Sequence, residues 1–234
     1  MAITFVASVE GSATNGGNVT LTLPSSIMVI NDVVVVSGGV PQTGVSVGTQ
    51  SSFGYTELIQ FNSSGSYRFV VDRKIMGNPV DTQVVCLGTA ASSDGISYVA
   101  QILRGVDRIT PEDATITSTS GTGTTPDSPS ITTVTDGAFV LSCVGSNVSD
   151  ITVTAPSGYS NQVDVNANDT RNSTVGMATI LKSSNGAEDP PSWTGFTTGV
   201  WCSASVALRP ETTWVPDRQE NASYNGSCIE VTGY

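Results

Sequence analysis

The chain has 234 residues, with 9 Lys and Arg against 20 Asp and Glu, and a formal net charge of −11 at pH 7. A chain of this sign repels phosphate backbones and anionic lipid headgroups, so neither nucleic acid nor a membrane is expected as a partner. It contains no histidine, which removes the commonest general base and excludes a Ser-His-Asp triad.

Apolar and polar residues alternate along much of the chain, and this period of two predicts strands with one wet face. The clearest alternation lies at residues 19–23, before Pro24, and at residues 200–208. No window shows a helical stripe flanked by caps. Gly, Pro, Asn and Ser clusters separate the runs, and the two longest breaks, residues 117–130 and 183–192, are predicted to be loops. Further strands are expected at residues 3–9, 33–36, 67–71, 83–87, 98–103, 139–144, 151–154 and 175–181.

The two halves of the chain repeat the same landmarks about 104 residues apart. These are an aspartate before an apolar strand, a Gly-Tyr loop, and a closing Leu-Arg pair that is displaced by one further residue. All are strand and turn elements, and the two halves share no catalytic residue. The repeat therefore favours a structural scaffold over a catalytic function. The matching residues are Asp32 and Asp136, Tyr55 and Tyr159, and Arg104 and Arg209.

We therefore expect an all-β fold, a jelly-roll-like antiparallel β-sandwich over residues 1–210, with pseudo-repeats at about 13–110 and 116–210. Each half is expected to open with a strand that pairs outside its own half. The alternative is two tandem Ig-like sandwiches with residues 117–130 as the linker. Residues 211–234 are predicted to form a C-terminal arm.

No catalytic residue, metal site or cofactor is predicted, and the chain is expected not to be an enzyme. It has no G-x-S-x-G elbow and no S-x-x-K motif, and its acidic loops lack calcium-loop spacing. Asp32 and Asp136 are expected to fix turns by accepting backbone N–H bonds. The cysteines, which lack C-x-x-C spacing, are expected to be free thiols, buried where they lie in strands. They are Cys86, Cys143, Cys202 and Cys228.

Several of these elements together resemble a β-sandwich domain common in structural proteins of tailed bacteriophages. They are the aspartate before a Val-rich run, the Ser/Pro-Gly-aromatic loop, and a final alternating strand that ends Ala-Leu-Arg-Pro. The resemblance covers about residues 13–210, and departs from the family where Tyr55 and Tyr159 replace a tryptophan and Phe53 replaces a serine. Its residues are 32–36, 52–56, 156–160 and 204–210.

The resemblance implies a virion protein made in the cytoplasm of a bacterial host. We expect a homo-oligomer that contacts other virion proteins, either the major capsid protein or tail proteins. A capsid decoration or cement protein is preferred, because no fibre shaft or coiled-coil repeat accompanies the domain. The alternative is a tail or tail-fibre adhesin that binds host surface glycans through Trp193, Tyr55 and Tyr159.

The C-terminal segment has two readings. Its apolar residues Trp214 and Val215, followed later by Ile229 and Val231 in alternation, predict an arm that adds a strand to a neighbouring subunit. The other reading is a frayed tail. On the first reading, these four residues form the subunit interface.

Overall fold

The computed structural model describes residues 1–42, 45–89, 91–149 and 152–212. Within these ranges the chain forms fourteen strands and one short 3-10 helix, Ser51–Phe53. Every pairing between named strands is antiparallel. The expected all-β antiparallel sandwich is confirmed, and its assignment to the jelly-roll class stays a prediction.

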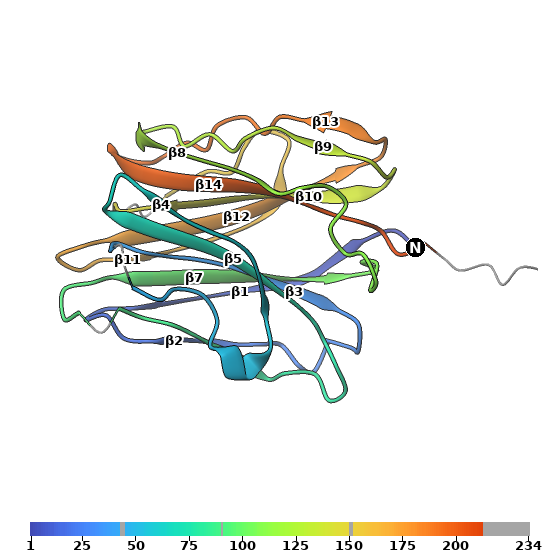
Figure 1. The fold of residues 1–234 in the computed structure, drawn as a ribbon, viewed down its shortest axis with the longest axis horizontal. Coiled ribbons are helices and arrows are strands. Elements are labelled where there is room, and N and C mark those ends of the chain that lie inside the picture. The colour runs from blue at the N-terminus through green and yellow to red at the C-terminus, as the bar shows by residue number, and fades with distance from the viewer. Residues whose placement is uncertain (43–44, 90, 150–151, 213–234) are drawn as a thin grey trace, which may run out of the picture.

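Two five-stranded sheets make up the body of the protein (Figure 1). Sheet one has the order β1 (Thr4–Ala13), β7 (Ile96–Arg104), β3 (Val33–Val40), β5 (Tyr67–Ile75) and β4 (Thr56–Ser63). Sheet two has the order β8 (Thr117–Gly123), β14 (Gly199–Leu208), β10 (Ala138–Ser146), β12 (Ser173–Lys182) and β11 (Ser160–Ala167). The order of equivalent strands is the same in both sheets, so the sequence repeat corresponds to a repeated sheet.

The two sheets pack face to face over a single core to which both halves contribute. A two-stranded ribbon covers the outer face of each sheet, β2 (Val19–Thr22) with β6 (Gln83–Cys86) on sheet one and β9 (Ile131–Thr133) with β13 (Gly186–Glu188) on sheet two. Figure 1 shows the resulting layers, from β2 at the bottom to β9 and β13 at the top. The shared core includes Val33, Phe69, Leu103, Leu141, Met177 and Val206.

The continuous valine run in β3 follows from this layering. Val33 and Val35 point into the core between the sheets, whereas Val34 and Val36 point into the core beneath β2 and β6. All four are fully buried. A strand covered on both faces gains from apolar residues at every position, so it does not alternate.

The loop predicted at residues 117–130 is wrong for residues 117–123, which form a strand. Thr117–Gly123 forms β8, which pairs with β14 over its whole length. Its Thr, Ser and Gly side chains carry no apolar face, so hydrophobic periodicity gave no signal. The expected pairing of opening strands outside their own half is also wrong, because β1 pairs with β7 and β8 with β14.

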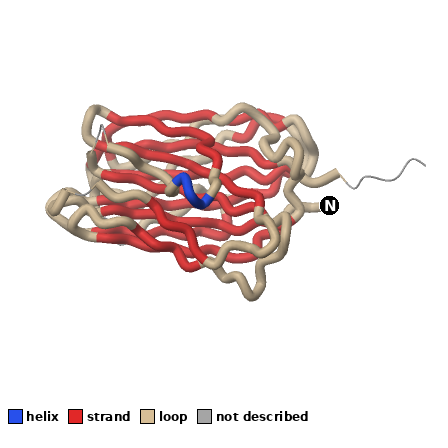
Figure 2. The backbone as a smooth tube through the Cα atoms, turned by 60° about the horizontal axis from the view of Figure 1, so that its bottom comes forward, coloured by secondary structure: helices blue, strands red, loops and turns tan. Residues whose placement is uncertain are grey.

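The loops gather at the two ends of the long strands (Figure 2). One end holds the start of β3, the finish of β7 and the finish of β14. There the Met1 ammonium donates to the Glu211 carbonyl, so the N-terminus lies beside the last described residues.

Three cysteines, Cys86, Cys143 and Cys202, are buried free thiols, as expected. Burial raises the pKa of Cys143 and of Cys202 to about 12, so both stay protonated at neutral pH. Cys228 lies outside the described residues.

Candidate functional site

Trp193 is fully buried. Its indole Nε1 donates to Ser142 Oγ at 2.8 Å, and the ring packs with Val144 and Phe196 on the outer face of sheet two. A Cβ atom added at Gly176 would lie 3.1 Å from the ring. Trp193 therefore offers no exposed face to a sugar, because the whole side chain covers the sheet.

Tyr159 is half-buried on the same outer face as Trp193, and its hydroxyl donates to Glu188 Oε1 at 3.2 Å. Lys182 Nζ lies 2.9 Å from the other Glu188 oxygen. The Tyr159 hydroxyl and the Lys182 ammonium thus both contact Glu188 and hold β13 against sheet two.

Tyr55 lies on the opposite outer face of the sandwich, against the apolar layer beneath β2 and β6. Lys74 Nζ lies 5.7 Å from its ring centroid and pairs with Asp81 at 2.6 Å. The three aromatic residues proposed to read a glycan therefore do not share a surface. In each half, the repeated tyrosine lies beside an ion pair of a lysine with an acid, Lys74 with Asp81 near Tyr55 and Lys182 with Glu188 near Tyr159.

The four residues predicted at a subunit interface, Trp214, Val215, Ile229 and Val231, lie outside the described residues.

The turn-fixing role is confirmed for Asp32, whereas Asp136 accepts a backbone N–H, as expected, from a loop 49 residues away along the chain. Asp32 Oδ2 accepts the Val29 N–H at 2.8 Å, and Asp136 Oδ1 accepts the Asn185 N–H at 2.7 Å. Asp32 is also fully buried and forms two contacts of 2.8 Å with the Arg104 guanidinium.

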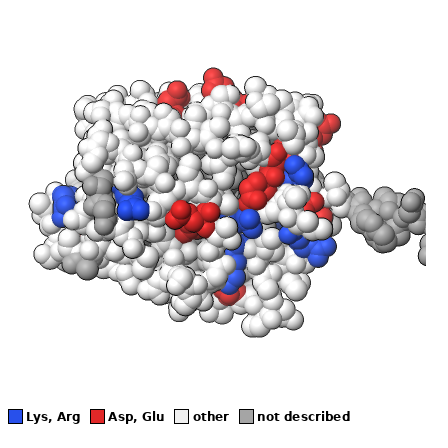
Figure 3. Space-filling view, in the orientation of Figure 1, with Lys and Arg blue, Asp and Glu red and all other residues white. Residues whose placement is uncertain are grey.

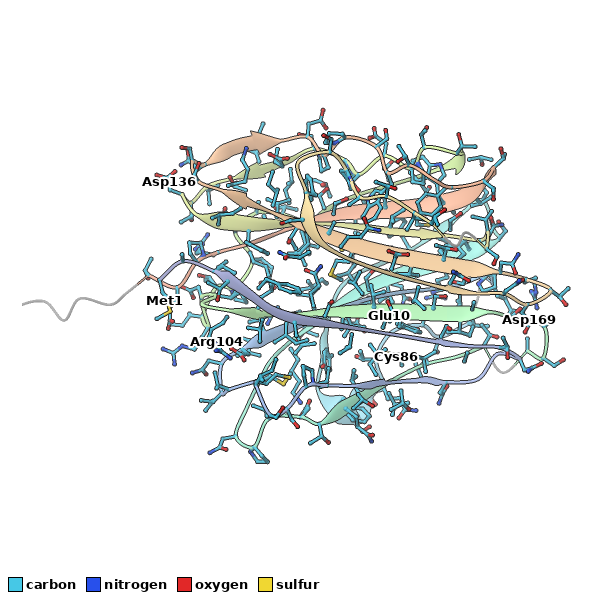
Figure 4. The ribbon with its side chains drawn as sticks, turned by 180° about the vertical axis from the view of Figure 1, so that it is seen from behind. Met1, Glu10, Cys86, Arg104, Asp136 and Asp169 are labelled. Carbon is cyan, nitrogen blue, oxygen red and sulfur yellow. The ribbon has the colours of Figure 1, made fainter. Side chains whose placement is uncertain are left out.

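Exposed large apolar side chains mark one end of the sandwich. Throughout the described ranges, every large apolar side chain that is strongly exposed lies at the end where β3 begins and β14 finishes. Figure 4 shows Met1, Arg104 and Asp136 at this end and Asp169 at the other. We call this surface the apolar end. It consists of Met1, Ile27, Val29, Ile30, Ile109, Val134 and Leu181.

The ion pair between the buried Asp32 and the partly exposed Arg104 holds the first turn of the apolar end in place. Arg104 Nη2 donates to the Ile27 carbonyl at 3.0 Å while its guanidinium pairs with Asp32. The backbone of Met76 bonds to residues 31 and 32 on the other side of the turn. Ile27, Val29 and Ile30 are therefore presented on a fixed backbone, which lowers the entropy lost on binding.

The second turn of the apolar end is fixed by Asp107. Its Oδ1 accepts the N–H groups of Ile109 at 2.8 Å and Thr110 at 2.9 Å. The bond from Thr110, followed by the bond from Ile109, lowers the pKa of the Asp107 carboxyl. Ile109, the residue so presented, is 91% exposed. Arg108 pairs with Glu211 at 3.2 Å, which joins this turn to the last described residues.

Charged side chains surround the apolar end. Arg209 pairs with the buried Asp113 at 3.3 Å, and Arg73 pairs with Glu112 at 2.6 Å. Figure 3 shows acidic and basic side chains interleaved toward this end, whereas most of the visible face is uncharged. Apolar side chains with a polar rim are the usual anatomy of a protein interface.

The sequence alone gave neither Ile27 nor Ile109 a functional role. In the structure, residues 27–30 form turns rather than a strand. The available signal was an apolar run that does not alternate and is closed by Asn31-Asp32, a pair typical of turns.

The opposite end of the sandwich is polar. Its side chains are engaged in holding loops: Asn147 Oδ1 accepts the Val200 N–H at 2.8 Å, and Arg171 pairs with the buried Asp94 at 2.7 Å. A hollow at this end is lined by Pro41, Gln42, Gly65, Ser66, Asn147, Thr170, Arg171 and Asn172.

Among the described residues, no three Cys, Asp or Glu side chains gather in a way that could hold a metal ion. The part of the chain that the structure describes contains no helix long and apolar enough to cross a membrane. Comparison with protein-family models, with curated proteins and with solved structures finds no match to this chain.

Proposed function

We propose that this protein is a non-enzymatic structural protein of a bacteriophage virion, a capsid decoration protein that sits on the particle through its apolar end. The virion assignment is supported by the resemblance of residues 32–36, 52–56 and 204–210 to phage structural domains. The mode of attachment is supported by the apolar end itself.

The observation that carries the proposal is the gathering of exposed apolar side chains on two fixed turns. Fully burying an exposed Ile or Val side chain contributes roughly 1.5–3 kcal/mol, and about half of that remains to be gained at Ile27, Val29 and Ile30, which are half-buried already. Ile109 alone leaves 91% of its surface in water until a partner covers it. A large apolar patch with a polar rim is typical of interaction sites.

The buried carboxylates support a structural role. Asp32 pairs with Arg104, Asp94 with Arg171, and Asp113 with Arg209. Each of these three acids is bound to a guanidinium, and the fourth buried acid, Asp72, accepts the Thr49 N–H, so all four carboxylates take part in contacts that hold the fold.

The structure does not favour the adhesin alternative. Trp193 is buried, and Tyr55 lies on the other face of the sandwich from Tyr159, so these residues do not form one glycan-binding surface. We therefore place decoration of the shell ahead of glycan binding.

Gold labelling of whole particles with an antibody to this chain, viewed by electron microscopy, tests the assignment. Label spread over the head would support decoration. Label confined to the tail would favour the adhesin, and unlabelled particles would refute both.

A binding assay tests the surface. Purified protein is cosedimented with particles assembled without it, and the double variant Ile27→Ser/Ile109→Ser is compared with wild type. Affinity should fall by about tenfold or more for each buried isoleucine. The control is Asn168→Ser, an exposed residue at the polar end. Equal binding by all three proteins would refute attachment through the apolar end.

A further inference from the structure

The sandwich has four edge strands, and one of them lacks the protection that the others carry. β1, β4 and β11 each contain a register shift, at Phe5/Ala7, Glu57/Ile59 and Ser160/Val163. Each also carries an acidic residue. Bulges and charges are the usual devices by which proteins prevent edge strands from pairing with other chains.

β8 has neither device. Its sequence is Thr-Ser-Thr-Ser-Gly-Thr-Gly, with no charged residue and no proline, and its register with β14 is unbroken from Thr117 to Gly123. β8 ends the strand order of sheet two, and no strand among the described residues pairs with its free side. In an antiparallel pair, alternate N–H and C=O groups of an edge strand face outward, so β8 offers a short open ladder.

A shallow groove with both apolar and polar lining residues runs beside the start of this ladder. It lies between β4 and the segment that leads into β8, and it is lined by Leu58, Ile59, Ala114 and Ile116 together with Glu112, Asp113 and Thr115. Leu58, Ile59 and Ile116 are partly buried and pack against the core between the sheets. An added strand with apolar residues on its inner face would complete this side of the core.

The chain contains a segment of that pattern. In Cys228-Ile229-Glu230-Val231-Thr232, the apolar Ile229 and Val231 alternate with polar residues, so both fall on one face of a strand. Residues 213–227 precede it and span up to roughly 50 Å when extended, enough to reach a neighbouring molecule from Thr212.

We propose that residues 228–232 of one copy add as a strand to the free edge of β8 in a second copy, with Ile229 and Val231 in the groove beside Leu58 and Ile116. Main-chain bonds to β8 supply part of the affinity, and the groove selects the alternating pattern. This rests on the proposed function as a subunit of an assembly, but its test needs no particle. It fails or succeeds independently of the gold labelling and cosedimentation results.

The test measures the oligomeric state of the full chain by light scattering and native mass spectrometry. Wild type should form oligomers, and Ile229→Asp/Val231→Asp should be monomeric with an unchanged circular dichroism spectrum. The matched control, Glu230→Gln, changes the outer face of the same segment and should assemble as wild type does. Unchanged assembly of the double Asp variant would overturn the proposal, and would point to pairing of β8 with β8.

Complementation identifies which surfaces meet. Leu58→Asp should also be monomeric, because it places a charge in the groove. Mixed with the Ile229→Asp/Val231→Asp variant, it should form a heterodimer, since one copy keeps its tail and the other its groove. Failure of two folded variants to associate would overturn the exchange between copies.

Hydrogen exchange supplies a readout that does not depend on the Leu58 variant folding. Outward-facing β8 amides should exchange severalfold more slowly in assembled wild type than in the tail variant. Protected β8 amides in a monomeric wild-type chain would show that the tail binds its own edge, and would overturn the proposal.

Discussion

The two halves of this protein build the same sheet but neutralise its closing arginine differently. Arg104, at the end of β7, pairs with Asp32, the aspartate that opens the first repeat. Arg209, just after β14, pairs with Asp113, which precedes β8, whereas the repeat-related Asp136 binds a backbone N–H of the loop before β13. The fold thus conserves a buried acid for each arginine, but not the position in the repeat that supplies it.

The outer layers of the two halves also differ. On the outer face of sheet one, Asp72 and Tyr98 are buried among aliphatic residues of β2 and β6. On the outer face of sheet two, a hydrogen-bonded chain of Ser128, Ser142 and Ser203 lies beside the Trp193 ring. One backbone plan therefore accepts either an aliphatic cover or one large ring with serine hydroxyls.

Substitution of Asp32 or Asp113 is expected to give the largest effects, and Asp136 serves as their comparison. Asp32→Asn and Asp113→Asn should each lower the free energy of unfolding by about 2–4 kcal/mol, because each leaves an arginine without its buried partner. Asp136→Asn should cost less than about 1 kcal/mol, since Asp136 is exposed. Urea unfolding at pH 7 measures all three. If Asp136→Asn cost as much as Asp113→Asn, the repeat alignment would predict energetics better than the contacts do.

The two sheets should also differ in how their stability depends on pH, because only sheet one has a buried acid at this position. Asp72 pairs across the sheet with Val36, and the matching pair in sheet two is Val140 with Ile180. Burial raises the pKa of Asp72 to about 6, although the Thr49 N–H donates to its Oδ2 at 2.6 Å. Because the folded-state pKa lies above the unfolded one, the wild type should lose stability as pH rises from about 4 through 6.

Asp72→Asn keeps an acceptor for Thr49 but does not ionise. The variant should therefore be more stable than wild type at pH 8, by on the order of 2–3 kcal/mol, and should have no such advantage at pH 4. Thermal unfolding across this range measures the difference. Parallel curves for the two proteins would mean that Asp72 ionises as readily in the folded state as in the unfolded chain.

The smallest expected effects distinguish the two repeated tyrosines. Tyr159→Phe removes the bond to Glu188 and should cost about 0.5–1.5 kcal/mol. The Tyr55 hydroxyl is buried and has no hydrogen-bond partner among the described residues, so Tyr55→Phe should be neutral or slightly stabilising. Chemical denaturation of both variants side by side measures this, and a larger loss for Tyr55→Phe would contradict it.

Much of the fold could be predicted because its strands alternate or are uniformly apolar. β2, β3, β7, β10 and β14 were found from such patterns. The edge strands β4, β8 and β11 were not. β8 has no apolar face, and in β4 the adjacent Leu58 and Ile59 interrupt the period of two at the register shift. Edge strands depend on their neighbours for pairing more than on their own pattern.

The sequence by itself determined the fold class, the repeat, the buried thiols and the turn-fixing role of Asp32, because each depends on local pattern or residue chemistry. Only the tertiary structure decided that Trp193 is core and that Ile109 is surface, since burial depends on which other segments cover a side chain. The same holds for the partner of Arg209, which lies 96 residues away in sequence. Contacts at that separation are set by how the sheets stack, which no local pattern records.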